Sequence, residues 1–129
     1  MYNNRGIIGD SVKYRVCVTE VFSAAHTIKS HKGVGRLVHG HDFKTRVCAI
    51  SESLGEGNIA VDLKMLESVV KKITENLDHK YLNEELGVED LSAEYIAHYI
   101  LLETKKHIAQ VYSVELCSNE GRYCVEVSE

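Results

Sequence analysis

Three histidines near the start of the chain have a spacing that suits a single metal ion. His39 and His41 flank Gly40 in the segment HGHDF, so both imidazoles leave the same face of an extended strand. His26 ends the segment FSAAH thirteen residues earlier, and an antiparallel return of the chain would bring it alongside as a third ligand. Three neutral imidazoles leave a tetrahedral zinc ion with one open position, as in catalytic sites. We therefore predict a catalytic zinc site at these three residues.

The same residues also have an ordinary structural interpretation. In this alternative, His39 and His41 are exposed strand residues that flank a glycine by chance, and they bind no metal. Gly33, Gly35 and Gly40 would then belong to a plain loop. The third histidine and its FSAAH context favour the metal site.

Hydrophobic periodicity predicts the elements that must position these histidines. Strands are predicted over residues 12–22, 39–51, 111–117 and 122–127. The first strand delivers His26 at its far end. Between the second and third strands lie two helices, one capped by Asp62 and ending near Leu77, the other beginning at Ser92. The order ββααββ predicts an α+β fold, in which two helices cover one face of a four-stranded antiparallel sheet and leave the other face open.

Length and charge limit the classes of function. With 129 residues the chain suffices for one domain, expected to span residues 1–129. A net charge of -4 argues against a nucleic-acid-binding protein. We find neither a signal peptide nor an apolar stretch of membrane-spanning length, so we expect a cytoplasmic protein with no membrane partner.

The cysteines are expected to be buried thiols. They lie within strand-like runs and have no C-x-x-C spacing, at positions Cys17, Cys48, Cys117 and Cys124. A disulfide between Cys117 and Cys124, which could face each other near a hairpin, is the lesser alternative.

Several motifs together resemble the 6-pyruvoyltetrahydropterin synthase family, which includes the 6-carboxytetrahydropterin synthases of queuosine biosynthesis. In chain order these motifs are FSAAH, HGHDF, VDLKML, LDHKYLN, SAEYIA and Glu115, and the resemblance runs from about Val12 to Val127. It implies the ββααββ tunnelling fold of that family. It also implies a homo-oligomer, a trimer or a hexamer, whose subunits join their sheets into barrels and so remove exposed sheet edges.

The resemblance also implies an activity and roles for individual residues. The activity is that of a zinc-dependent lyase that converts 7,8-dihydroneopterin triphosphate into a 6-pyruvoyl- or 6-carboxy-tetrahydropterin. The zinc ligands would be His26, His39 and His41. Asp78 and His79 match the pair that transfers protons, and Glu115 matches the carboxylate that grips the pterin ring. Without the resemblance, Asp78 and His79 read as polar residues at a helix end, and Glu115 as an outward strand residue.

One residue of the family pattern is missing. The family places a cysteine, or in one variant a glutamate, four or five residues before HGH as the general base. Here those positions are Gly35 and Val34. Three outcomes follow: His31 in the same loop acts as the base, the reaction is a retro-aldol cleavage to 6-hydroxymethyl-dihydropterin, or the protein binds a pterin or purine-like ligand without turnover.

Overall fold

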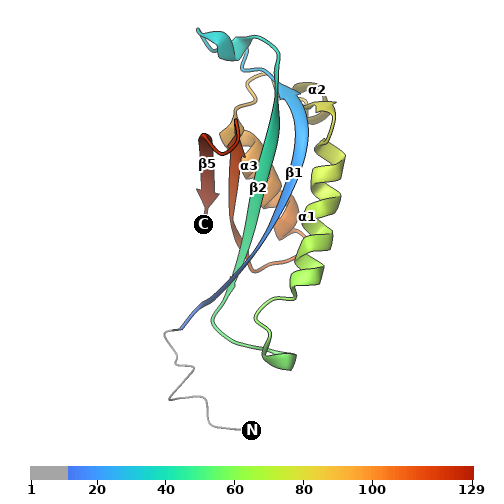
Figure 1. The fold of residues 1–129 in the computed structure, drawn as a ribbon, viewed down its shortest axis with the longest axis vertical. Coiled ribbons are helices and arrows are strands. Elements are labelled where there is room, and N and C mark those ends of the chain that lie inside the picture. The colour runs from blue at the N-terminus through green and yellow to red at the C-terminus, as the bar shows by residue number, and fades with distance from the viewer. Residues whose placement is uncertain (1–11) are drawn as a thin grey trace.

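The computed structural model describes residues 12–129, and the segment at residues 1–10, predicted to be a loose or edge segment, lies outside the described residues. Figure 1 shows long strands on one side and helices on the other. The elements in chain order are β1 (Tyr14–His26), η2 (Val34–Arg36), β2 (His39–Ser51), η3 (Glu56–Asn58), α1 (Leu63–Leu77), β3 (Lys80–Tyr81), α2 (Leu82–Leu86), α3 (Ala93–Lys105), β4 (Val111–Ser118) and β5 (Tyr123–Ser128).

The sheet has five strands in the order β3-β1-β2-β4-β5. Its four long strands are antiparallel to their neighbours, whereas β3 pairs in parallel with β1 through Lys80 and Tyr81. The predicted α+β class is therefore right. The predicted four-stranded antiparallel sheet with two helices is wrong in detail, because the sheet is mixed and α2 is a third helix. Both missed elements are too short for hydrophobic periodicity to reveal.

Helices α1 and α3 cover one face of the sheet. Helix α1 packs against β1, and α3 packs against β4 and β5. Asp62 caps α1 as predicted, since its carboxylate accepts the N–H groups of Lys64 and Met65. Between the layers the rings of Phe22 and Phe43 lie 5.3 Å apart across β1 and β2. This core holds the ends of β1 and β2 in place, where the histidines lie.

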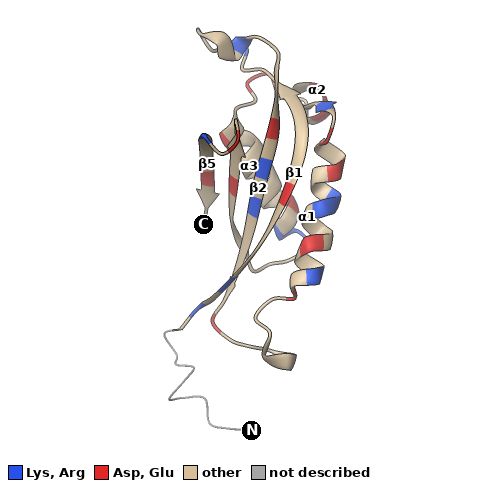
Figure 2. Ribbon diagram, viewed as in Figure 1, with Lys and Arg blue, Asp and Glu red and all other residues tan. Residues whose placement is uncertain are grey.

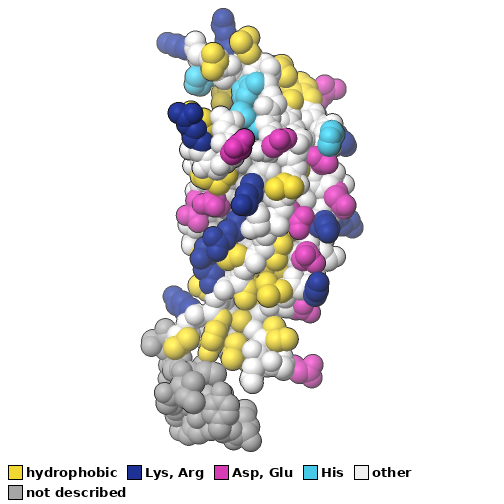
Figure 3. Space-filling view, viewed as in Figure 1, with side chains coloured by type: hydrophobic (Ala, Val, Ile, Leu, Met, Phe, Trp, Pro, Cys, Tyr) yellow, Lys and Arg dark blue, Asp and Glu magenta, His cyan; other side chains and the backbone are white. Residues whose placement is uncertain are grey.

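The other face of the sheet is not covered by these helices. It presents the alternate residues of each strand, among them Lys44 and Arg46 of β2. Figure 2 shows basic positions along β2 and an acidic position on β1, and Figure 3 shows basic side chains running along this face. Within residues 12–129 we find no helix with the length and apolar character needed to cross a membrane.

All four cysteines form disulfides, Cys17 with Cys48 and Cys117 with Cys124. The prediction of buried thiols is therefore wrong, and the alternative of a Cys117–Cys124 bond is right. The cause is the register, because each pair lies directly opposite on adjacent antiparallel strands. Cys17 and Cys48 are 31 residues apart, and periodicity alone does not fix which residues of two strands face each other.

Candidate metal centre and active site

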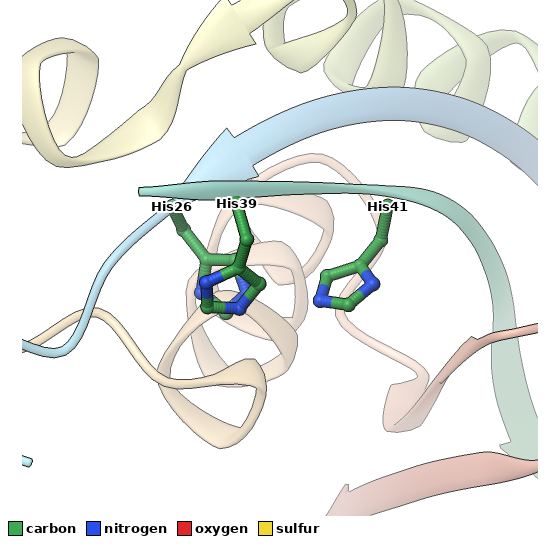
Figure 4. A group of neighbouring side chains, drawn as sticks. All are labelled: His26, His39 and His41. Carbon is green, nitrogen blue, oxygen red and sulfur yellow. The ribbon is translucent and has the colours of Figure 1, made fainter. Parts of the chain in front are cut away.

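The ends of β1 and β2 bring the three predicted metal ligands together. His26 pairs directly with His39 across the strands, and His41 lies opposite Ala24 on the same face. The ring centroids are 4.5 Å apart for His26 and His39, 4.9 Å for His39 and His41, and 5.4 Å for His26 and His41. One ring nitrogen of each residue lies within 4.8 Å of the others. Figure 4 shows the three rings leaving the same side of the strands.

Backbone carbonyls orient two of these rings. His26 Nδ1 lies 2.6 Å from the oxygen of Leu91, and His39 Nδ1 lies 2.7 Å from the oxygen of Leu37. Because a carbonyl oxygen only accepts, each Nδ1 carries the proton and each Nε2 keeps its lone pair. His26 Nε2 is buried and has no hydrogen-bond partner among the described residues. A buried acceptor without a partner is costly, and a metal ion shared with His39 and His41 would satisfy it. The donor set therefore fits zinc.

The surroundings favour the neutral form of the rings. Burial is the largest cause that lowers the pKa of His26, and the neighbouring His39 and His41 lower it further, although the bond to Leu91 acts in the opposite direction. Burial and His39 likewise lower the pKa of His41, although a hydrogen bond to Asn119 acts in the opposite direction. Since a metal binds only the neutral imidazole, both shifts favour ligation at neutral pH.

Asn83 of α2 supports this centre from behind, and the sequence prediction missed it. Its buried side chain accepts the N–H of Thr27 at 2.8 Å and donates to the oxygens of Thr27 at 2.8 Å and Glu89 at 2.9 Å. The N–H of Leu91 also donates to Thr27. The residue that follows His26 is thus tied to the segment that orients its ring. A buried amide that hydrogen-bonds to the backbone does not appear in the hydrophobic periodicity of the sequence. Only the position of Asn83 in the motif LDHKYLN could have indicated its role.

Asp78 and His79 lie beside β1, directly after α1. Oδ2 of Asp78 lies 3.0 Å from Nδ1 of His79, and Oδ1 accepts the N–H of Ser23 at 2.8 Å. These bonds, that from Ser23 first, lower the pKa of Asp78, so the carboxylate is ionised and can orient the His79 ring. His79 has a φ of 59°, in the left-handed region that a residue other than glycine rarely adopts, and its N–H donates to Ser23 O at 2.6 Å.

A surface hollow of about 550 Å³ lies beside this pair. Its walls include Ser23, His41, Asp42, His79 and Tyr81. On one wall the hydroxyl of Ser23 donates to Asp42 at 2.5 Å. The hollow therefore combines the imidazole oriented by Asp78 with a carboxylate, and its size suits a small heterocyclic molecule. His41 borders it, but the His41 ring lies beside His26 and Phe43, on the face of β2 opposite to Asp42.

Glu115 lies apart from this hollow. It occupies the middle of the uncovered sheet face, opposite Arg46 on β2 and Glu126 on β5. A separate hollow of about 490 Å³ exposes it, together with Arg46 and Lys44. Within one chain the structure thus does not bring Glu115 to His79.

Comparison with known proteins decides the family. The family model described as 6-pyruvoyl tetrahydropterin synthase matches residues 15–129. The chain belongs to the 6-pyruvoyl tetrahydropterin synthase family. A 6-carboxy-5,6,7,8-tetrahydropterin synthase of Synechocystis is 34% identical over 111 residues, which cover 79% of this chain and 86% of that protein.

Solved structures of the 6-pyruvoyl tetrahydropterin synthase family share the fold. The Caenorhabditis elegans 6-pyruvoyl tetrahydropterin synthase superposes with a TM-score of 0.76 at 19% identity, covering 92% of this chain and 96% of that one. The Plasmodium falciparum enzyme superposes with a TM-score of 0.68 at 18% identity, covering 91% of this chain and 99% of that one.

The loop at residues 34–35, where the resemblance predicts a general base, contains no residue of that kind. Val34 is 81% exposed, and neither it nor Gly35 has an ionisable side chain. His31, predicted as a substitute, is exposed and absent from the walls of both hollows. Its Nδ1 accepts the N–H of Gly33 at 2.9 Å, and its ring lies against Gly35, where an added Cβ would come within 3.1 Å. In this position the neutral ring keeps its proton on Nε2 and presents a donor outward.

Proposed function

We propose that the protein is a zinc-dependent lyase of the pterin synthase type, which acts on 7,8-dihydroneopterin triphosphate or a close relative. Its product would be a 6-carboxy- or 6-pyruvoyl-tetrahydropterin. The main support is the histidine centre, where the unpartnered Nε2 of His26 lies next to His39 and His41. The similarity to the Synechocystis 6-carboxy-5,6,7,8-tetrahydropterin synthase agrees with this class of product.

His26, His39 and His41 would hold the zinc, with His26 and His39 binding through Nε2. When bound, zinc would supply a Lewis acid that polarises substrate oxygens and acidifies the neighbouring hydrogens. His79 would take up and return protons at the edge of the hollow. The ionised Asp78 would keep the His79 ring in one orientation and stabilise its protonated form.

Glu115 would bind the pterin ring. A pterin presents an edge of N–H donors, which a carboxylate can accept in bidentate fashion. Because Glu115 and His79 open into separate hollows, we extend the proposal to a homo-oligomer, a trimer or a hexamer, in which one chain supplies Glu115 and another supplies His79 to the same substrate. Joined sheets would also cover the open edge of β5 and the part of β1 that lies beyond its two-residue pairing with β3.

A second candidate reaction is retro-aldol cleavage to 6-hydroxymethyl-dihydropterin. The loop residues Val34 and Gly35 offer no group that could replace the missing cysteine or glutamate, whereas the bonds between Asp78 and His79 are intact. A reaction that needs only zinc and this pair would proceed without a base in the loop.

The test is to incubate zinc-loaded protein with 7,8-dihydroneopterin triphosphate and to identify the products by mass spectrometry. A carboxy or pyruvoyl product would support the main proposal, and the hydroxymethyl product would support the second. The matched variants are His39→Ala, expected to lose zinc and product, and His79→Ala, expected to keep zinc and lose product. A third result would exclude both reactions. If the wild type binds a pterin but forms no product, and if His79→Ala binds the pterin with the same affinity, the protein is a binding module.

A further inference from the structure

Three potential metal ligands converge on the uncovered face of the sheet, away from the histidine centre. Cys117 of β4 lies directly opposite Cys124 of β5, and Glu115 precedes Cys117 by two residues, so all three side chains leave the same face. One carboxylate oxygen and the two sulfurs lie within 4.8 Å of one another. We call these three residues the Glu115 cluster.

The Glu115 cluster is open to solvent. It lines the hollow of about 490 Å³ that also exposes Lys44 and Arg46. Cys124 is exposed, Glu115 is partly exposed and Cys117 is buried. A reducing agent can therefore reach the disulfide from the side of Cys124, and an ion can reach the same place from solution.

Reduction by a dithiol would free both sulfurs, which would separate only from bonding to non-bonded contact while their residues stay opposite each other. The protein disulfide takes up two electrons and two protons, its S–S bond breaks, and the dithiol closes into a disulfide of its own. The β4–β5 pairing continues on both sides of the cysteines, from Ser113 with Ser128 to Ser118 with Tyr123. This ladder holds the two thiols opposite each other after reduction.

The charges around the reduced pair favour a divalent cation. Glu126 lies directly opposite Glu115, and two like charges at such a position repel each other. Lys44 and Arg46 line the same hollow and favour thiolates over thiols. Arg15 is a third basic group, since it lines a small cavity with Glu115 and Glu126. Two thiolates and two carboxylates then outnumber the three basic groups, so the reduced cluster keeps a negative charge that attracts a divalent ion.

We propose that the reduced protein binds a thiolate-preferring divalent metal ion, such as zinc, through Cys117, Cys124 and Glu115, and that the Cys117–Cys124 disulfide excludes this ion. Two sulfurs and one oxygen leave a fourth position of a tetrahedral ion for water. The Glu115 cluster differs from the histidine centre in its ligands, in the face it occupies and in its dependence on reduction.

Cobalt(II) distinguishes the two sites, because thiolate ligands give it an intense near-ultraviolet charge-transfer band that imidazole ligands do not give. The experiment uses His39→Ala protein, in which the histidine centre is disabled, in oxidised form and after treatment with a dithiol that is then removed under anaerobic conditions. Reduced His39→Ala protein should bind about one cobalt ion per chain and develop the band, and the oxidised protein should develop none.

Matched substitutions assign the band. Adding Cys124→Ser should abolish it, and adding Glu115→Gln should weaken cobalt binding by about tenfold or more. Adding Cys17→Ser removes the other disulfide and should leave the band in place. Circular dichroism checks that each variant is folded, and because Cys124 is exposed its replacement leaves the core unchanged. Absence of the band in reduced protein, or a band that survives Cys124→Ser, would overturn the proposal. No pterin is present, so the result is independent of the proposed activity.

Discussion

The histidine centre and the Glu115 cluster lie on opposite faces of one sheet and are held in different ways. At the histidine centre, carbonyl oxygens fix the rings of His26 and His39, and Asn83 fastens the backbone behind them. In the Glu115 cluster, strand register and a disulfide alone place the ligands. The first site is thus prepared for a metal whatever the redox conditions, whereas the second depends on the state of one S–S bond. Four predictions test this difference.

The largest expected effect follows from removing a ligand of the histidine centre. His39→Ala should weaken zinc binding by more than about 100-fold. This exceeds the typical effect of losing only a group that hydrogen-bonds to a metal ligand. Elemental analysis of oxidised, zinc-supplied protein measures this directly. His98→Ala, an exposed histidine of α3, is the matched control and should keep its zinc. Full zinc content in oxidised His39→Ala protein would contradict the assignment.

The next effect concerns proton transfer rather than metal binding. Asp78→Asn should lower kcat by about 100-fold and leave zinc content unchanged, because His79 loses the carboxylate that orients it. Asp90→Asn is a close control. Asp90 also accepts a serine N–H, that of Ser30, and also has a lowered pKa, but it forms no ion pair with a histidine. Equal loss of kcat in the two variants would show that Asp78 acts through the fold alone.

A smaller effect is expected from the support behind the histidine centre. Asn83→Ala leaves the buried N–H and carbonyl of Thr27 with fewer partners and should lower the free energy of unfolding by about 1–3 kcal/mol. Zinc affinity should fall by about tenfold as well, because the segment that orients His26 is loosened. Urea unfolding and zinc titration measure the two effects, with the exposed Asn76→Ala as control. Cobalt binding by the reduced Glu115 cluster should not change, and a parallel loss there would argue against separate sites.

The smallest effect is a pH dependence of the metal-free protein. The folded-state pKa values of His26 and His41 lie below the ordinary value of 6.5, mainly through burial. As pH falls below 6.5, the unfolded chain therefore binds more protons than the folded chain, and the free energy of unfolding decreases. Urea midpoints of chelator-treated protein over this range measure the slope. His26→Ala should flatten it and His98→Ala should not; equal slopes in all three proteins would refute this origin.

The same contrast explains how far the sequence could predict the molecule. The H-x-H spacing and the alternation of β1 and β2 predict that His39 and His41 share a face, because strand geometry is local. The cap of α1 at Asp62 is local in the same sense, and it is confirmed. These features need only the period of a strand or a helix.

Features that depend on contacts between distant segments could not be predicted. The pairing of Cys17 with Cys48 needs the register of two strands, and the amide of Asn83 bonds to Thr27, 56 residues away. Strand β3 has only two residues and forms because His79 and Ser23 tie it to β1. The separation of Glu115 from His79 likewise became visible only once the strands were placed.

At position 79, folding and chemistry favour different residues. A backbone with a φ of 59° suits glycine, and an L-residue there is less favourable by about 1–2 kcal/mol. A glycine would have no imidazole for Asp78 to hold. If His79 performs the proposed proton transfer, the turn is less stable with this histidine than it would be with glycine. A search for more stable variants that ignored activity would therefore replace His79 early.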